Sequence, residues 1–220
     1  MTHRLVVIGG GAAGMSAASA ARRADPDLEI VVLEATGYTA YGQCGIPYFL
    51  AGLDERADEL LAHPAAFFRD RRRIEVRLHA EAVDLDVGRA TVSYRHDGRS
   101  HRIGFSALVV TAGGTPGVVP LPGVPRDRVF TIRTLEDAIA LRSLLDAGRV
   151  GSALVVGAGY VGLEMAEAFA HRGCAVTVVE RLDRCLPTVD APVEHQVVQR
   201  HAVPRRPHAG QAGAHPVVDP

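Results

Sequence analysis

The sequence predicts an α/β fold in which a unit of strand, glycine-rich turn, helix and strand occurs twice. The first copy covers residues 4–34 and the second covers residues 153–180. In both, a short apolar strand leads through G-x-G-x-x-G into an alanine-rich helix. The copies lie about 150 residues apart, which is too far for a solenoid repeat. We therefore expect two Rossmann-like lobes, the second of them incomplete.

The elements of the first copy follow from its residue pattern. RLVVIGG, residues 4–10, is an apolar β-branched run of the kind that parallel sheets bury on both faces. GAAGMSAASAARRA contains no breaker after Gly14 and predicts a helix that ends near Asp25. LEIVVLE, residues 28–34, predicts the second strand.

The first glycine turn has the features of a dinucleotide site. A tight turn, close backbone approach to a pyrophosphate and close helix packing each need a glycine, and a carboxylate at the end of the next strand suits ribose hydroxyls. This context is more specific than a glycine pattern alone, for which a plain turn is an equal alternative. The predicted cofactor-binding residues are Gly9, Gly11, Ala12, Ala13, Gly14 and Glu34.

The second copy repeats the pattern in ALVVGAGYVGLEMAEAFAHRGCAVTVVE. Glu180 ends its second strand and favours the free 2'-hydroxyl of NADH, whereas Arg181 and Arg184 could accept the 2'-phosphate of NADPH. Both cofactors stay open, with NADH preferred. The predicted contacts are Gly157, Gly159, Tyr160, Val161, Gly162 and Glu180. Two dinucleotide sites in one chain predict electron transfer between a nicotinamide and a flavin.

Cys44, in TAYGQCGIPYFL, is the candidate catalytic residue. Pro47 suits the first turn of a short helix, which would place Cys44 at an N-terminal edge where free amides favour a thiolate. A buried structural cysteine is the alternative. Cys174 is expected to pack in the core and Cys185 to lie in a loop, and the three cysteines form neither a disulfide framework nor a metal site.

Composition narrows the class of protein. The chain of 220 residues is 47% hydrophobic and 22% charged, with a formal net charge of -1, as in soluble globular proteins. We expect no nucleic-acid partner, since there is no basic surplus, and no membrane partner, since no apolar run is long enough to span a bilayer. With no signal-peptide pattern and few cysteines, the expected location is cytoplasmic.

The remaining segments complete the expected organisation. An arginine-rich amphipathic stretch and a hairpin lie between the copies, and a Pro/Gly-rich connector precedes a helix near TLEDAIALRSLLDAG. The last twenty residues have no periodic apolar pattern, so we expect them to be irregular and disordered. The expected domains are a flavin-binding lobe at 1–115, a connector and helix at 116–150, a partial nicotinamide-binding lobe at 151–200 and a tail at 201–220.

Four segments together resemble the pyridine nucleotide-disulfide oxidoreductase family. They are VVIGGGAAGMSAA, YGQCGIPYFLAG, LVVTAGGTP and VVGAGYVGLEMAEAF. The resemblance is to the single-cysteine branch, which includes coenzyme A disulfide reductases, NADH oxidases and peroxidases, and persulfide reductases. Two-cysteine relatives carry a second Cys where this chain has Phe49. Cys44 would then cycle alone, as a sulfenic acid or as a mixed disulfide.

This resemblance implies the cofactors and the remaining site residues. FAD would bind the first lobe, with Thr111, Ala112 and Gly113 near the flavin, and NADH or NADPH would bind the second. The substrate would be a small-molecule thiol or disulfide, with coenzyme A as a candidate, although Gln43 replaces the Asn that is frequent before the cysteine. The expected substrate residues are Arg23, Gln43 and Arg72.

The resemblance also leaves three functions open. Family members are about twice as long and homodimeric, and the dimerisation domain is absent from this sequence. The preferred function is an FAD-dependent NAD(P)H reductase of a disulfide or persulfide. The alternatives are an NADH oxidase or peroxidase that uses a cysteine sulfenic acid, and an inactive nucleotide-binding fragment.

Overall fold

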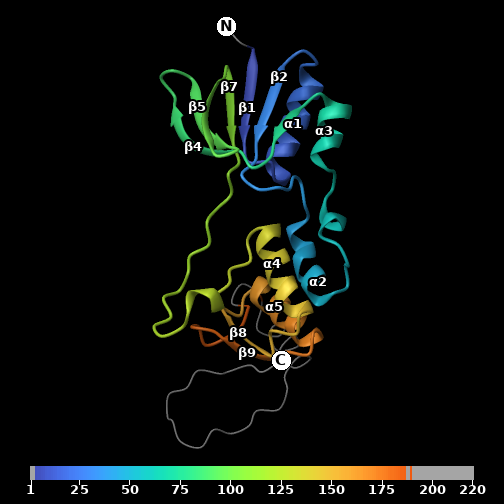
Figure 1. Cartoon of the computed structure of the whole chain (residues 1–220), viewed down its shortest axis with the longest axis vertical. Helices are drawn as coiled ribbons and strands as arrows, with labels where there is room; N and C mark the ends of the chain where they lie inside the picture. The colour runs from blue at the N-terminus through green and yellow to red at the C-terminus, as the bar shows by residue number, and fades with distance from the viewer. Residues whose placement is uncertain (1–2, 187–188, 190–220) are drawn as a thin grey trace, which may run out of the picture. The chain divides into compact units, whose positions relative to one another are not determined.

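The structure, a computed structural model, describes residues 3–186 and residue 189 and divides into two compact units. Each unit contains one copy of the repeated strand-turn-helix-strand arrangement (Figure 1). The α/β fold class predicted from the sequence is confirmed. Unit 1 is Met1–Cys44 with Arg56–Ile139, and unit 2 is Gly45–Glu55 with Ala140–Pro220.

Unit 1 is built on a parallel sheet of four strands in the order β3-β2-β1-β7. The central strand β1 pairs with β2 from Arg4↔Glu29 to Ile8↔Leu33 and with β7 from Leu5↔Ala107 to Ile8↔Val110. Apolar side chains at most of these positions suit a sheet that is covered on both faces. The strands are β1 (Arg4–Ile8), β2 (Glu29–Leu33), β3 (Glu75–Arg77) and β7 (Ala107–Val110).

Different layers cover the two faces of this sheet. On one face, Leu5 and Val7 belong to a cluster with Met15 and Ala18 of helix α1 (Ala12–Ala24), which also includes Phe68 of helix α3 (Ala65–Arg72). On the other face, alternate strand residues pack on an antiparallel sheet of three strands. These strands are β4 (Glu81–Asp86), β5 (Thr91–His96) and β6 (Arg99–Gly104).

The end of α1 is fixed to α3 by hydrogen bonds. Asp25 follows the helix and its Oδ1 accepts the backbone N–H groups of Asp27 and Leu28, so the chain turns at the predicted position. The Arg22 guanidinium donates to the backbone oxygens of Arg72 (3.0 Å) and Arg73 (2.8 Å) at the end of α3. It therefore satisfies carbonyls that a helix terminus leaves without intrahelical partners.

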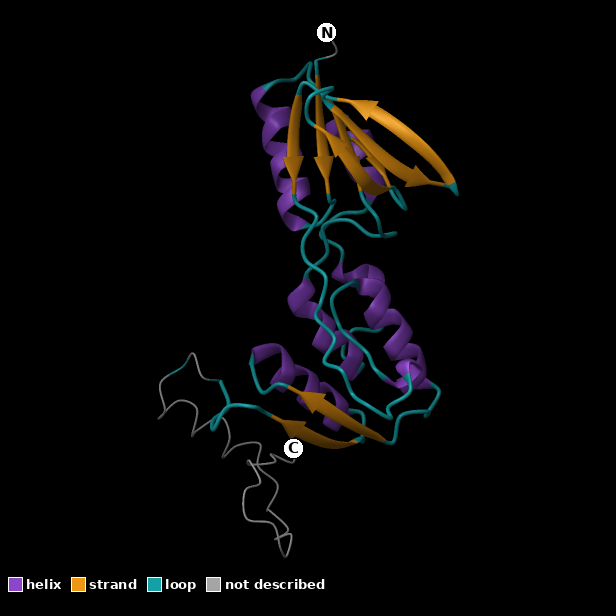
Figure 2. Cartoon of the chain, turned by 90° about the vertical axis from the view of Figure 1, so that its left-hand side faces the viewer, coloured by secondary structure: helices purple, strands orange, loops and turns teal. Residues whose placement is uncertain are grey.

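Unit 2 repeats the arrangement with two parallel strands, β8 (Ser152–Val156) and β9 (Ala175–Val179). Helix α5 (Tyr160–His171) connects them and packs on both. Helix α2 (Ile46–Ala51) packs against α5, and the second half of helix α4 (Leu135–Asp146) belongs to the same unit. Figure 2 shows the helices of this unit on one side of the strand pair.

Among the described residues, the remaining elements are three short 3-10 turns: Gln43–Gly45, Ala57–Leu60 and Arg126–Arg128. The helix expected near TLEDAIALRSLLDAG is α4, and the expected hairpin is β5–β6. The irregular tail expected at 201–220 lies outside the described residues. In the part of the chain that the structure describes, the helices are all too short or too polar to cross a membrane.

Candidate functional site

The glycine turn of unit 1 is a close-packed structure that excludes side chains. Gly9 has a positive φ of 97°, and a Cβ there would lie 2.3 Å from the backbone oxygen of Thr111. A Cβ on Gly14 would lie 1.9 Å from the backbone oxygen of Gly9. Both distances are shorter than any van der Waals contact. Glycine at position 9 therefore lets Thr111 approach the turn, and glycine at position 14 lets α1 approach β1.

The start of α1 leaves room for a ligand. A Cβ on Gly11, the residue that caps the helix, would meet no described atom within 4 Å. Ala12 and Ala13 in the first turn are exposed, so their small side chains leave the amide groups accessible. An accessible helix N-terminus behind a glycine turn fits the pyrophosphate of a dinucleotide.

Glu34 is buried beside this turn, and hydrogen bonds fix its carboxylate. Its Oε2 accepts the backbone N–H of Gly10 at 2.6 Å. Its Oε1 accepts both the backbone N–H (2.8 Å) and the hydroxyl (2.7 Å) of Thr36. A Cβ on Gly10 would lie 3.0 Å from the Glu34 Cβ. Sequence reasoning missed Gly10 and Thr36, although a third adjacent glycine was a visible indication.

A second carboxylate lies on the same turn. The N–H of Gly37, next to Thr36, donates to Glu136 Oε1 at 2.8 Å. Glu136 Oε2 is buried and has no hydrogen-bond partner among the described residues, which leaves one acceptor free. Burial raises the pKa of nearby Tyr41. Glu136 comes from α4, far along the chain, so no local pattern in the sequence indicated it.

Thr111 closes the turn from the side of β7. Its backbone N–H donates to the Ile8 oxygen at 2.7 Å, and its hydroxyl lies 2.9 Å from the oxygens of both Ile8 and Gly9. Ala112 and Gly113 follow it and are exposed. The structure thus brings Thr111 to the glycine turn as a packing partner, with its two neighbours accessible.

Cys44 is exposed and lies in the Gln43–Gly45 turn, two residues before α2 begins. The segment that leads to it, residues 40–43, is hydrogen-bonded within unit 1. The N–H of Ala40 donates to the Gly10 oxygen at 3.0 Å, and the N–H of Gly42 donates to the Leu60 oxygen at 2.9 Å. Ala40 is hydrogen-bonded to the glycine turn, and only residues 41–43 separate it from Cys44.

Arg133 holds the residue before Cys44 from another part of unit 1. Its Nη1 donates to the Gln43 side-chain oxygen at 3.0 Å, and its Nε donates to the backbone oxygen of Gly114 at 3.2 Å. The backbone N–H of Arg133 donates in turn to Asp137 at 3.1 Å. This residue therefore links the cysteine turn to the segment after Thr111, and sequence reasoning missed it.

The two arginines predicted to contact substrate lie in the last turns of two helices of unit 1. Arg23 lies in the last turn of α1 and is exposed. Arg72 ends α3 and places its guanidinium carbon 5.5 Å from the centre of the Phe67 ring. The hydrogen bond from Arg22 to the Arg72 backbone joins the ends of these two helices. Gln43, the third predicted substrate residue, is hydrogen-bonded to Arg133 and not to either of these arginines.

Unit 2 repeats the geometry of the first turn. Gly157 has a positive φ of 104° and its N–H donates to the Val179 oxygen at 2.7 Å. A Cβ on Gly162 would lie 1.9 Å from the Gly157 oxygen. Gly159 caps α5, and a Cβ on this residue would meet no described atom within 4 Å. The next two residues, Tyr160 and Val161, are exposed.

Glu180 occupies the place that Glu34 has in unit 1. It accepts the N–H of Ala158 at 2.7 Å and that of Leu182 at 2.9 Å. The hydrogen bonds from Leu182 and Ala158 lower the pKa of Glu180, which is therefore a carboxylate at neutral pH. Arg184 donates to the Val189 oxygen at 2.6 Å.

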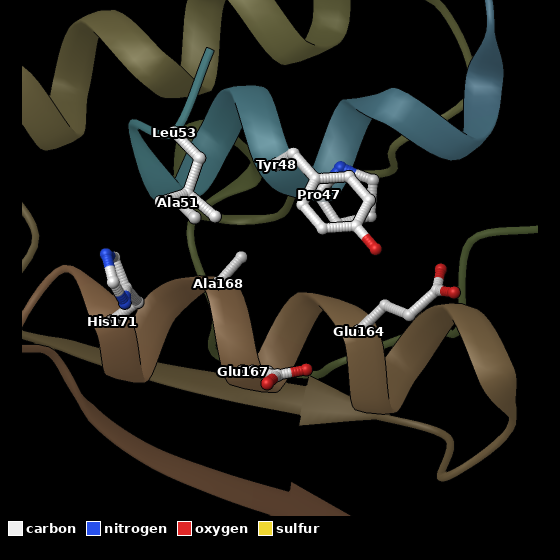
Figure 3. A pocket seen from close by; sticks show the side chains of 8 residues that line it. All are labelled: Pro47, Tyr48, Ala51, Leu53, Glu164, Glu167, Ala168 and His171. Atoms are coloured by element: carbon white, nitrogen blue, oxygen red, sulfur yellow. The ribbon is translucent and has the colours of Figure 1, made fainter.

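A cavity of about 170 Å³ lies between α2 and α5 of unit 2. Figure 3 shows its lining, with apolar and aromatic side chains from α2 facing two carboxylates and His171 of α5. None of the predicted site residues lines it. The lining residues are Pro47, Tyr48, Ala51, Leu53, Glu164, Glu167, Ala168 and His171.

The other two cysteines are buried. Cys174 donates to the Val150 oxygen at 3.3 Å, as expected for a cysteine packed in a core, and Cys185 lies in a bend after β9. Within residues 3–186, no group of three or more His, Cys, Asp or Glu side chains is placed to hold a metal ion.

Known proteins that are similar to this chain include two curated relatives and one solved structure. The NAD(P)H coenzyme A polysulfide/persulfide reductase of Pyrococcus horikoshii is 39% identical over 186 residues, 84% of this chain and 41% of its own length. The NADH oxidase of Methanocaldococcus jannaschii is 33% identical over 90% of this chain and 44% of its own length. The solved NAD-dependent persulfide reductase of A. fulgidus superposes with a TM-score of 0.83 at 34% identity, over 90% of this chain and 38% of its own.

The chain thus spans less than half the length of these relatives. The family model described as "Pyridine nucleotide-disulphide oxidoreductase" matches residues 3–203, which include both glycine turns and Cys44. With the fold, the order of the motifs and this match in agreement, the chain belongs to the pyridine nucleotide-disulphide oxidoreductase family.

Proposed function

We propose that this protein takes part in an FAD-dependent transfer of electrons from NAD(P)H to a small-molecule disulfide or persulfide, through Cys44. One observation carries the proposal: the same cradle of glycine turn, helix N-terminus and fixed carboxylate is built twice. A backbone N–H donates to Glu34 in unit 1 and to Glu180 in unit 2, at 2.6 and 2.7 Å. Two such cradles suit two dinucleotides.

FAD fits the cradle of unit 1. Gly11, Ala12 and Ala13 would receive its pyrophosphate, because nothing described fills the space beside Gly11. Glu34 would accept hydrogen bonds from the ribose hydroxyls. When bound, FAD supplies two-electron transfer between a nicotinamide and sulfur. The exposed Ala112 and Gly113 are proposed to contact its ring.

The nicotinamide dinucleotide is proposed to be NADH and to bind unit 2 through Gly157, Gly159, Tyr160, Val161 and Gly162. Glu180 is ionised and directed at Ala158, where a ribose would lie, so a 2'-phosphate would meet a like charge. Of the two arginines that could offset this charge, Arg184 already donates to a backbone oxygen, whereas Arg181 is exposed next to Glu180 and keeps NADPH as the alternative. These contacts support NADH over NADPH.

Cys44 is the proposed nucleophile. Its thiolate attacks one sulfur of R–S–S–R', a Cys44–S–S–R bond forms, and R'S⁻ leaves and takes a proton. Two electrons from NAD(P)H and one proton then cleave the mixed disulfide into the Cys44 thiolate and RSH. In a persulfide R–S–SH, attack on the outer sulfur releases RS⁻ in the same way. The proposed substrate contacts are Gln43, Arg23 and Arg72, and arginines suit the phosphates of a coenzyme A thiol.

The experiment uses the 220-residue chain purified with FAD. We expect one FAD per chain, bleaching by NADH, and consumption of NADH with coenzyme A disulfide or persulfide. Cys44→Ser should retain FAD and bleaching but lose the turnover of sulfur substrates, whereas Cys174→Ser should retain both. A chain that binds neither dinucleotide would instead be an inactive fragment and would overturn the proposal.

The second candidate is an NADH oxidase or peroxidase, which the similarity to the M. jannaschii enzyme supports. In that reaction Cys44 would be oxidised by peroxide to a sulfenic acid and reduced back with release of water. Consumption of NADH with oxygen or peroxide, at a rate that coenzyme A disulfide does not raise, would favour this candidate. Trapping of a sulfenic acid on Cys44 with dimedone would identify the intermediate.

A further inference from the structure

The cavity between α2 and α5 of unit 2 contains none of the residues assigned to the dinucleotides or to sulfur chemistry. At one end, Tyr48 of α2 lies opposite Glu164 of α5 (Figure 3). At the other end, Leu53, just after α2, lies opposite His171 (Figure 3). The volume of about 170 Å³ is smaller than the roughly 300–1,000 Å³ of pockets for drug-sized ligands. A ligand of this cavity is therefore a small molecule.

The wall formed by α2 and the residues after it is apolar and aromatic. Its lining residues are Pro47, Tyr48, Ala51 and Leu53. Tyr48 and Leu53 are 57% and 59% exposed, although both have large apolar side chains. A ligand that covers them would remove this apolar surface from water, which is favourable.

The wall formed by α5 is acidic. Glu164 and Glu167 line it and lie three residues apart, so they project from one face of the helix. Both are exposed, and neither side chain has a hydrogen bond or an ion pair within the described residues. Arg172, which follows α5, pairs with Asp146 instead. The described lining holds no arginine, so the negative charge of this wall is not compensated inside the cavity.

Packing within unit 2 holds the two walls in place. Arg142 donates to the backbone oxygens of Phe49 and Asp54, which fixes α2 and the segment after it. Where α2 packs on α5, Ala51 and Ala168 are buried and have small side chains, so the space between the helices stays unfilled. The cavity is thus already formed in the free chain, which lowers the cost of binding.

The charges of the walls select the class of ligand. An anion would be repelled by the two glutamates, whereas a cation would be attracted by them and by the Tyr48 ring. A metal ion is a poor fit, because within the described residues no group of three His, Cys, Asp or Glu side chains is placed to hold one. A cation that carries a hydrocarbon portion matches both the acidic and the apolar wall.

We propose that the cavity between α2 and α5 binds a small organic ammonium ion. The two glutamates hold the ammonium group, and Tyr48 and Leu53 contact the hydrocarbon portion. This inference is independent of the reaction proposed for Cys44, because it uses neither that residue nor a residue of either glycine turn.

The test titrates the 220-residue chain with three probes of similar shape at pH 8, where histidine is ordinarily neutral. The probes are 2-phenylethylammonium, the uncharged 2-phenylethanol and the anion 3-phenylpropionate. Isothermal titration calorimetry should show that the alcohol binds at least about 10-fold more weakly than the ammonium ion, because it lacks the attraction to two carboxylates. The anion should not bind. An ammonium ion that does not bind, or binds no better than the alcohol, would overturn the proposal, as would displacement of the ammonium ion by NADH.

Four variants locate the site. Glu167→Gln and Leu53→Ser should each weaken the ammonium ion at least about threefold, because each removes part of one wall. Glu55→Gln removes an exposed carboxylate of unit 2 outside the cavity, and Leu154→Ser changes a leucine of equal exposure, 58%. These two controls should leave the affinity unchanged, and circular dichroism should show all four variants folded. Equal weakening in the controls would show binding outside the cavity and overturn the proposal.

Discussion

The guanidinium of Arg133 donates to the side-chain oxygen of Gln43 across 3.0 Å, and so fixes the residue before Cys44 from a position 90 residues further along the chain. The same side chain donates to the Gly114 oxygen. The Gln43–Gly45 turn and the segment after β7 are therefore both hydrogen-bonded to the Arg133 guanidinium. A substitution of Arg133 removes this link and leaves the residues of both glycine turns unchanged.

Arg133→Gln should slow the reaction of Cys44 with the anionic disulfide DTNB by about threefold or more, because the variant removes a cation that attracts the reagent and frees the turn. The measurement is stopped-flow absorbance on the native chain, where the buried Cys174 and Cys185 react later. Arg126→Gln, an exposed arginine of the same unit, is the control. An equal slowing in both variants would show a general charge effect and contradict the assigned contact.

Gly11→Val and Gly159→Val test the two cradles separately. Each residue has open space beside it, so the chain should fold with an unchanged midpoint of denaturation. We expect Gly11→Val to lower FAD affinity at least about 10-fold without affecting NADH, and Gly159→Val to do the reverse, because each side chain fills the space for one pyrophosphate. Fluorescence titrations of both dinucleotides measure this. Loss of both ligands in either variant would contradict two separate sites.

Gly14→Ala should lower the stability of the fold, whereas the two valine variants should lower the affinity for a dinucleotide. The added methyl would overlap the Gly9 oxygen, at 1.9 Å, so the helix must move away from β1. We expect a loss of about 3 kcal/mol or more in the free energy of unfolding, at the upper end for single substitutions. Urea denaturation measures it, with Gly117→Ala as the control at an open position. Near-wild-type stability would show that the close contact can relax without cost.

Arg142 anchors α2 to α4 within unit 2. Its guanidinium donates to the backbone oxygens of Phe49 and Asp54, lies 5.0 Å from the centre of the Phe49 ring, and pairs with Asp146. Arg142→Ala should cost about 2–3 kcal/mol of unfolding free energy, since it leaves two carbonyls without this donor. Arg149→Ala, at an exposed position of the same unit, should cost far less. Equal losses would contradict the anchor.

The ion pairs of Asp146 with Arg142 and Arg172 predict that the stability of the fold depends on pH. Burial acts to raise the pKa of Asp146, but hydrogen bonds from Arg142 and Arg172 overcome this and hold it below its ordinary value of 3.8. A lowered folded-state pKa stabilises the fold above the unfolded-state pKa, and this contribution is lost as pH falls through the folded value. Since the carboxylate is half exposed, Asp146→Asn should cost only about 0.5–1 kcal/mol at pH 7.

The measurement is urea denaturation of the wild type and Asp146→Asn between pH 7 and pH 3. The difference between them should be constant near neutrality and shrink below the ordinary Asp pKa of 3.8. A difference that grows on acidification would have the wrong sign and would contradict the two ion pairs. Asp127→Asn, at an exposed position with no ion pair among the described residues, is the control.

The sequence by itself determined the repeated unit, its elements and the two glycine turns. Gly9, Gly14, Gly157 and Gly162 could be read locally, because a turn with positive φ and a helix packed against the preceding strand exclude a Cβ whatever lies elsewhere in the chain. Glu34 and Glu180 followed from their spacing, since the second strand of each unit must end beside the turn.

Only the tertiary structure decided which distant groups complete each site. Arg133 reaches Gln43, and Glu136 reaches Gly37, because the helix and loop that carry them fold back on unit 1, and no short-range pattern encodes such contacts. The same reason applies to β8, whose apolar sequence predicts a strand but does not say which of its faces is covered. The burial of a strand depends on which neighbours the fold supplies, and the described residues supply β8 with fewer than they supply β1.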